Sequence, residues 1–202
     1  MTQKVLKYSA VCVASVLLIF LFLYGFMQCQ LWRHEVFKEA TYDTIPPVIV
    51  TAVDKPNILV FSKTNSFRLI DAIPAVNSLF SEEAKNRNWA VFQTENAAVH
   101  NTEDLAKFDL IIWNNVAGDV LTKEHRGAFK SYLETGGQLL ALHGSGGDAG
   151  YRWKWYPEQI IRAQFRGHPL VPQFQTASLV VEDRDHPATI DLPNDWRLKD
   201  EW

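Results

Sequence analysis

The residues best suited to chemistry lie where an apolar run, residues 139–142, ends at His143 and the glycine-rich turn of residues 144–147. A continuous apolar run bounded by turn residues is typical of a strand buried on both faces. Glycine lets the backbone turn sharply and lets a ligand approach it closely. We therefore expect His143 at the carboxyl end of a central parallel strand, where open α/β sheets bind their ligands. An imidazole there could act as an acid or a base near neutral pH. The alternative is a histidine at the edge of the core that bonds a backbone carbonyl.

The elements that must position this histidine can be read from the same periodicity. Compact apolar runs predict four strands, over residues 57–62, 89–94, 109–114 and 138–143. Helices are predicted between them, one near residues 71–86 with Asp71 as N-cap and one near residues 122–133 with Thr122 as N-cap. Strands that alternate with helices indicate an α/β fold, a parallel sheet flanked by helices on both faces.

Polar residues follow the other predicted strands, and the carboxyl ends of parallel strands meet at one edge. Ser62 and Asn114 should therefore converge with His143, and Arg68 lies in the loop after the first strand. Arg68 and Asn114 could orient oxygen atoms of a substrate. The alternative for Arg68 is an ordinary loop cation.

The first part of the chain predicts a membrane anchor. Residues 8–27 are almost wholly apolar and carry no charge, which is about the length that a helix needs to span a bilayer. We assign residues 1–29 to the anchor and residues 30–56, with Pro46-Pro47, to a juxtamembrane linker. A cleaved signal peptide is an alternative, and Cys29 leaves lipidation open. The charges flanking the apolar segment favour a cytoplasmic N-terminus, which would place the domain on the extracytoplasmic side.

Composition and charge argue against some classes of partner for the domain. The 202 residues carry a net charge of -3 and no run of basic residues, so we expect no nucleic acid partner. Both cysteines lie in or just after the anchor, so the domain has no thiolate metal site.

The aromatic segment of residues 151–156 is either a helix packed by its rings or a lid over the pocket. Further on, residues 158–165 predict a helix and residues 173–182 a strand.

The order of these pieces resembles the ThuA-like (trehalose utilisation) family over residues 57–202. The segments that carry the resemblance are residues 61–68, 108–109, 117–122, 136–137, 142–143, 167–169, 181–189 and 200–202. The resemblance implies a class I glutamine amidotransferase-like fold with flavodoxin-like layering. In true amidotransferases the turn after this strand carries a catalytic cysteine, whereas this chain has His143 there. Glutamine hydrolysis through a thiolate is therefore not expected.

The family is associated with sugar metabolism, so the expected partner is a small carbohydrate or an oxidised derivative of one. His143 would be the catalytic acid or base, with Glu201 or Asp200 as its partner, because the resemblance places the last three residues at the pocket. The predicted substrate contacts are Ser62, Arg68, Asn114, Trp202 and His168. No cofactor is expected, and the histidines lack the spacing of a compact metal site. The alternative is a membrane-tethered carbohydrate-binding or scaffold module without turnover.

Two departures from the family pattern affect these expectations. Family members usually continue beyond the motif that ends here at Trp202, so we expect the domain to be truncated at its C-terminus. They also commonly carry a histidine directly after the arginine matched by Arg68, where this chain has Leu69. That difference removes one expected polar member of the pocket. Oligomeric state cannot be read from the sequence.

Overall fold

The computed structural model describes residues 2–146, 151–169, 171–172 and 174–201. It divides into two compact units, Met1–Gln164 and Phe165–Trp202. The first unit contains the predicted sheet, and the second contains a β-hairpin. Each is described by itself below.

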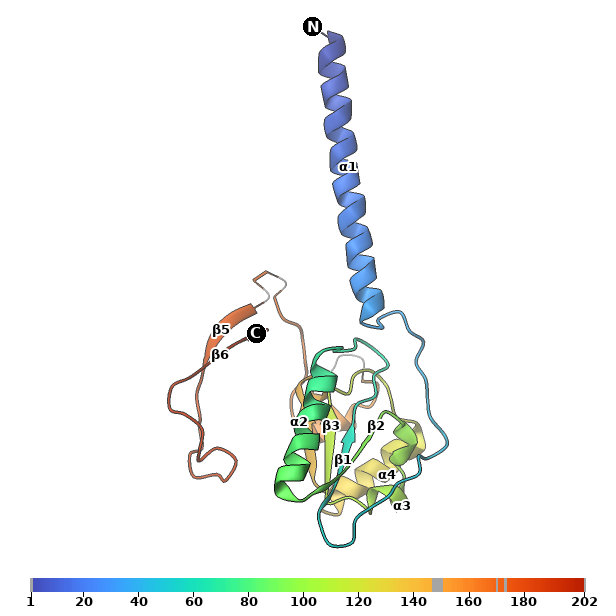
Figure 1. The fold of residues 1–202 in the computed structure, drawn as a ribbon, viewed down its shortest axis with the longest axis vertical. Helices are drawn as coiled ribbons and strands as arrows, with labels where there is room; N and C mark the ends of the chain where they lie inside the picture. The colour runs from blue at the N-terminus through green and yellow to red at the C-terminus, as the bar shows by residue number, and fades with distance from the viewer. Residues whose placement is uncertain (1, 147–150, 170, 173, 202) are drawn as a thin grey trace. The chain divides into compact units, whose positions relative to one another are not determined.

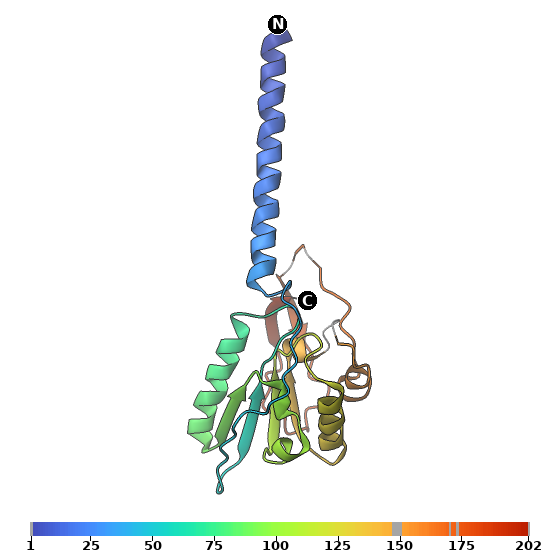
Figure 2. The same cartoon turned by 90° about the vertical axis from the view of Figure 1, so that its right-hand side faces the viewer.

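The first unit is an N-terminal helix followed by a four-stranded α/β layer structure (Figure 1). Its larger elements are α1 (Thr2–Arg33), β1 (Asn57–Phe61), α2 (Ala72–Arg87), β2 (Ala90–Thr94), α3 (Thr102–Leu105), β3 (Leu110–Asn114), α4 (Lys123–Glu134) and β4 (Leu139–Leu142). All strand pairs are parallel, in the order β2-β1-β3-β4. Helix α2 covers one face of the sheet and α4 the other (Figure 2). The predicted fold class and the four predicted strands are thus confirmed.

The core forms because β1 and β3 are apolar on both faces. Alternate residues of these strands enter two separate clusters, as the period of two requires. The larger cluster lies toward α4, where Trp113 stacks on Phe129 with ring centroids 4.8 Å apart. The smaller one, formed by Ile58, Val60 and Ile112, packs toward α2. The central strands β1 and β3 are therefore rigidly held, and their carboxyl ends are fixed in space.

The helix ends follow the sequence only in part. The side chain of Thr122 accepts a hydrogen bond from the backbone N–H of His125 and caps α4 as predicted. Asp71 stands at the N-cap position of α2 as predicted, but its side chain makes no capping hydrogen bond. The reason is its backbone, which is already helical (φ -97°, ψ -37°), whereas a capping residue needs an extended conformation.

Downstream, the aromatic segment packs into the first unit. Tyr156 is buried, and its ring lies 4.8 Å from that of Trp113. Of the two alternatives for residues 151–156, the rings pack as the first one requires, but residues 151–154 are not helical. The helical turn η3 spans Tyr156–Ile161; it overlaps the predicted helix of residues 158–165 but begins and ends earlier.

The second unit is an antiparallel hairpin of β5 (Phe174–Leu179) and β6 (Trp196–Glu201). The strand predicted over residues 173–182 is confirmed for its described middle part, while residue 173 lies outside the described residues. Strand β6 was not predicted. Two-stranded sheets have little stability alone, because one hairpin buries little apolar surface.

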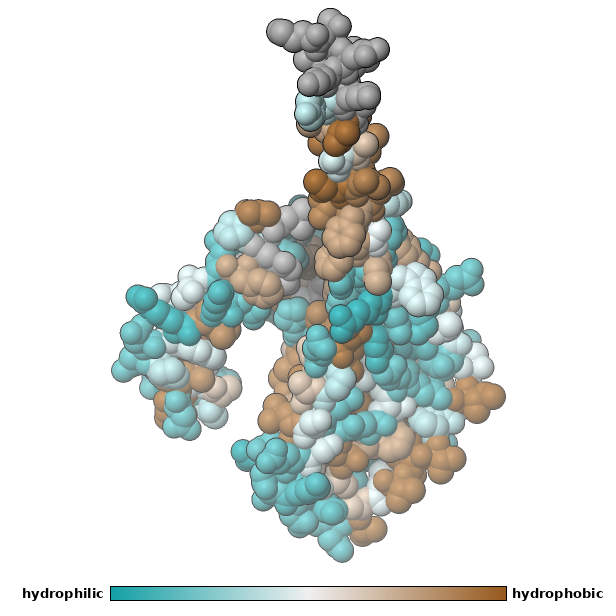
Figure 3. Space-filling model, turned by 45° about the horizontal axis from the view of Figure 1, so that its top comes forward, coloured by the Kyte–Doolittle hydropathy of each residue, from teal (hydrophilic) through white to brown (hydrophobic). Residues whose placement is uncertain are grey.

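Helix α1 has the composition that the sequence suggested. Its Val11–Arg33 part has a mean hydropathy of 2.3, with none of its most apolar window buried against the rest of the chain. Figure 3 shows hydrophobic side chains gathered over this helix. The helix is long and apolar enough to cross a membrane, although an N-terminal signal sequence would satisfy the same criteria.

Candidate functional site

The candidate site begins at His143, which directly follows β4 and opens the short turn His143–Gly146, here called the elbow. His143 has φ 46°, a left-handed conformation that a residue with a Cβ rarely adopts. Its side chain is exposed, and none of the described residues gives its imidazole a hydrogen bond or an ion pair. The predicted position of His143 at a strand end is therefore what the structure has, with the ring open to solvent.

The elbow is held from beneath by a buried hydroxyl. The Ser145 hydroxyl donates to the backbone oxygen of Trp113 at 2.8 Å and accepts from the backbone N–H of Val116 at 2.7 Å. The Tyr156 hydroxyl donates to the backbone oxygen of Ser145 at 2.8 Å. These bonds join the elbow to the loop after β3 and to the aromatic segment. They fix the backbone around His143, which is how a strained conformation persists in a folded protein.

The other two predicted strand-end residues reach the same edge of the sheet but are enclosed. Ser62 is 2% exposed and Asn114 is 0% exposed. The Asn114 amide donates to the backbone oxygen of Ile73 and to the Asn77 side chain, and its oxygen accepts from Asn115. These contacts tie β3 to α2 and give Asn114 a structural role. Substrate contacts by Ser62 and Asn114 stay predictions.

Arg68 is engaged by an acidic partner. Its two terminal nitrogens donate to the two Glu95 carboxylate oxygens, at 3.1 Å and 2.6 Å. Hydrogen bonding to Glu95 raises the pKa of the Arg68 guanidinium, against the opposing effect of burial. The backbone of Arg68 also bonds His34, whose ring stacks on Phe67. The loop after β1 is thus joined to the chain just beyond α1.

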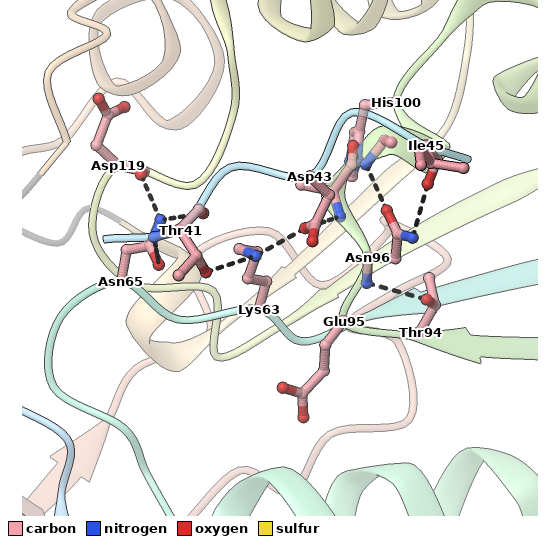
Figure 4. A network of polar contacts seen from close by, with 12 residues as sticks. Thr41, Asp43, Ile45, Lys63, Asn65, Thr94, Glu95, Asn96, His100 and Asp119 are labelled. Atoms are coloured by element: carbon pink, nitrogen blue, oxygen red, sulfur yellow. Dashed lines mark hydrogen bonds and ion pairs between the residues drawn. The ribbon is translucent and has the colours of Figure 1, made fainter. Parts of the chain in front are cut away.

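A feature that the sequence did not predict lies over the carboxyl ends of β1 and β2. Residues 41–45, here called the strap, run along this edge and bind it through alternate residues (Figure 4). The backbone of Thr41 exchanges two hydrogen bonds with the Asn65 side chain, at 3.0 Å and 2.9 Å. The backbone oxygen of Ile45 accepts from Asn96 at 2.9 Å. The alternation is that of an extended segment, which presents every second residue to one side.

Between the Thr41 and Ile45 contacts, the strap places the Asp43 carboxylate against the buried Lys63 ammonium. The Asp43 carboxylate lies 2.7 Å from the Lys63 ammonium, and the same oxygen accepts from the Ala97 N–H at 2.8 Å. The Lys63 side chain is only 9% exposed. Burial alone would raise the pKa of Asp43, but the bonds from Lys63 and Ala97 outweigh it and hold the pKa below its ordinary value. The segment predicted to be a linker therefore supplies the carboxylate that neutralises Lys63 at this edge of the sheet.

Two histidines lie beneath the strap. His100 is fully buried: its Nε2 accepts from the Trp113 indole at 3.0 Å, and its Nδ1 lies 3.2 Å from the Ala97 oxygen. Burial lowers the pKa of His100 to about 3, so the ring is neutral at physiological pH. His125, at the start of α4, is 9% exposed, and its Nδ1 has no hydrogen-bond partner among the described residues. Burial lowers its pKa as well, although the charges of Glu124 and Asp43 oppose this.

The remaining predicted site residues belong to the second unit. His168 is exposed, and Asp200 and Glu201 lie in β6. Trp202 lies outside the described residues. Their convergence with His143 stays a prediction, as does the pairing of His143 with Glu201 or Asp200. The loop between the two strands bounds a cavity of about 500 Å³ whose lining includes Asp183, His186 and Trp196.

Two other features of the described residues offer neither a sugar site nor a metal site. An aromatic-lined cavity beside Trp113 and Tyr151 has a volume of about 10 Å³, room for about one water and not for a sugar. In the described part of the chain, no group of three or more His, Cys, Asp or Glu side chains could hold a metal ion. The carboxyl edge of the sheet is therefore the candidate site in the first unit.

Comparison with known proteins agrees with this architecture. The model of the ThuA family, described as trehalose utilisation, matches residues 57–202. A solved structure from Bacteroides uniformis, described as a ThuA-like protein, matches with a TM-score of 0.60 and 18% sequence identity. The match covers 76% of this chain and 63% of that chain. At this identity the similarity concerns the fold alone. No curated protein sequence showed significant similarity.

Proposed function

We propose that this chain, which belongs to the ThuA (trehalose utilisation) family, acts on a sugar or an oxidised sugar by acid-base chemistry at His143. The observation that carries the proposal is the elbow. A solvent-exposed imidazole stands at φ 46° at the carboxyl end of a parallel strand, on a backbone braced by Ser145. Strained, over-determined backbone of this kind is concentrated at functional sites.

The surroundings of His143 suit acid-base chemistry. An acid or base must be able to reach a substrate proton, and His143 is exposed and unpaired among the described residues. A carboxylate partner is expected from Glu201 or Asp200, on the basis of the family resemblance. The first unit has no cysteine beyond Cys12 and Cys29 of α1, so a thiolate mechanism is not proposed.

Helix α1 would hold this domain at a membrane as an uncleaved anchor, with the domain on the extracytoplasmic side. Cell fractionation with protease accessibility tests both points. The full chain should pellet with membranes, and protease added from outside should remove the domain. Release into the soluble fraction without α1 would instead identify a cleaved signal.

The function is tested by incubating the full chain, in detergent micelles, with unoxidised and oxidised disaccharides and following monosaccharide release. His143→Gln should lower turnover by about 100-fold or more, the usual contribution of an acid-base residue. His186→Gln, at an exposed histidine that is not among the predicted substrate contacts, is the matched control and should keep turnover. Turnover that is unaffected by His143→Gln would remove the proposal.

A second candidate function is carbohydrate binding without turnover. It is favoured by the cavity of about 500 Å³ in the second unit, whose lining includes Trp196. A tryptophan ring suits the apolar face of a sugar, and the volume suits a small ligand. Disaccharide binding that Trp196→Ala abolishes, with no conversion by the intact chain, would support this reading over the first.

A further inference from the structure

The Asp43–Lys63 contact has an unusual origin for a buried ion pair. Lys63 lies in the loop directly after β1, next to Ser62, but its counter-ion comes from the strap, outside the segment that matches the family. The carboxylate of Asp43 is bound in the way that proteins bind small anions: by an ammonium at 2.7 Å and by a backbone N–H at 2.8 Å. Both donors, Lys63 and Ala97, belong to the domain and would remain if the strap left.

The groups around the Asp43–Lys63 pair also favour an anion at this position. The Lys63 side chain is more than nine-tenths buried, so its charge cannot stay there without an anion. His125, also about nine-tenths buried, has an Nδ1 atom without a hydrogen-bond partner among the described residues. It is close enough for its charge and that of Asp43 to influence one another. His125 therefore adds an unpartnered polar atom to the surroundings of the ion pair.

The strap itself is attached by contacts that can separate. Within the described structure, Asp43 supplies the charge that pairs with buried Lys63, and the Thr41 hydroxyl accepts a second bond from the same ammonium at 3.1 Å. Other strap contacts are hydrogen bonds of Thr41 with the Asn65 amide, of the Tyr42 hydroxyl with Asp119, and of the Ile45 backbone with the Asn96 amide. Thr44 and Ile45 are exposed, and so is Thr41. The close packing of this edge comes from the domain, where Gly118 touches Asn65 so closely that an added Cβ would lie 2.6 Å from its backbone. The receiving surface is thus preformed, and the strap lies on it.

We propose that Lys63 and the Ala97 amide form a binding site for the anionic group of a small molecule, a carboxylate or a phosphate, and that Asp43 occupies it as an internal mimic. The inference rests on the proposed function only for the sugar character of that molecule. Strands β1 and β4 are two strand spacings apart, about 10 Å. A sugar acid or sugar phosphate held at Lys63 could therefore extend toward His143.

The test uses the full chain in detergent micelles, with inorganic phosphate and gluconate as separate probes in isothermal titration calorimetry. Asp43→Asn keeps the shape of the side chain and removes its charge, so it should bind a probe at least tenfold more tightly than the wild type. Adding Lys63→Gln to that variant should abolish the gain. Glu39→Gln, an exposed carboxylate just before the strap, should behave as the wild type. Whichever probe responds identifies the anion as phosphate or carboxylate.

A second measurement needs no substitution and covers the case in which Asp43→Asn does not fold. If phosphate or gluconate competes with Asp43, it should speed limited proteolysis within the strap of the wild-type chain severalfold, while chloride at equal ionic strength should not. Equal binding by wild type and Asp43→Asn, or a gain that survives Lys63→Gln, overturns the proposal. So does strap proteolysis that neither probe changes. Anion binding without disaccharide turnover would keep this site and remove only the function proposed at His143.

Discussion

The two ends of the carboxyl edge of the sheet differ in whether their polar groups are buried and paired. At the strap end, over β1 and β2, a buried cation is neutralised by Asp43, and the histidine beneath is locked between two partners. At the elbow end, after β4, His143 is exposed and its backbone is strained. The polar groups at the strap end are therefore paired and covered by the chain, whereas the imidazole at the elbow end is open to solvent. A ligand would meet His143 directly but could reach Lys63 only by displacing part of the chain.

The largest expected effect is the pH sensitivity of the strap end. The unfolded chain binds a proton at His100 near pH 6.5, whereas the folded protein resists it down to a pKa of about 3. The free energy of unfolding should therefore fall as pH falls through this window, by about 1.4 kcal/mol per pH unit from His100 alone. Denaturant unfolding at pH 7, 6, 5 and 4 measures it.

His100→Gln is the informative variant for this window, because an amide can keep both hydrogen bonds without titrating. It should flatten the pH dependence by about that amount per unit. His168→Gln, at an exposed site, should leave the slope as it is. An unchanged slope in His100→Gln would mean that burial does not control this ring. Asp43 adds a smaller effect in the same direction, since its lowered pKa gives stability that is lost only below its ordinary value of 3.8.

The next largest expected effect is the loss of stability when the Asp43–Lys63 ion pair is broken. Lys63→Met should destabilise the protein by about 2 kcal/mol, because it leaves the partly buried Asp43 carboxylate without its cation. Lys38→Met breaks the exposed pair with Glu35 just before the strap and should change stability little. Thermal unfolding of both variants gives the comparison. Similar small losses in both would show that the strap contributes nothing beyond an ordinary surface pair.

The smallest effect belongs to the elbow and has the opposite sign. His143→Gly should leave stability unchanged or raise it by up to about 1 kcal/mol, since glycine relieves the cost of φ 46°. Asn88→Gly relieves a similar φ of 55° at the end of α2, away from the edge, and is the matched control. Turnover should be lost in the first variant and kept in the second. A clear loss of stability in His143→Gly would mean that its side chain supports the fold.

The sequence predicted the sheet well because its signals are local. Runs such as residues 58–61 and 110–113 are apolar without interruption, and a helix separates each strand from the next, which leaves few possible topologies. The same logic placed His143 at a strand end. It could not indicate the left-handed backbone there, because positive φ depends on the bonds that Ser145 makes to residues about thirty positions earlier.

The strap was missed for a physical reason. Residues 41–45 are polar in part and stand beside Pro46-Pro47, which is the composition of a tether. Their binding depends on Lys63 and Asn96, which are far from them in the chain and come together only after the sheet forms. The one local signal was a lysine directly after a predicted buried strand, where a charge needs a partner. Strand β6 was missed because its alternation is short: only Trp196 and Leu198 are apolar, and the strand then continues through the two acidic residues 200–201.

The most direct test of the central claim, that the open elbow is where the sugar binds, is an NMR titration of the histidine-labelled full chain. The sequence has six histidines, including His143 at the elbow and His186 beside the cavity of the second unit. His143→Gln and His186→Gln assign the two imidazole signals. The account predicts that a disaccharide substrate or its oxidised form shifts the His143 signal and leaves that of His186 in place. A shift of His186 alone, with His143 unmoved at saturating sugar, would contradict it.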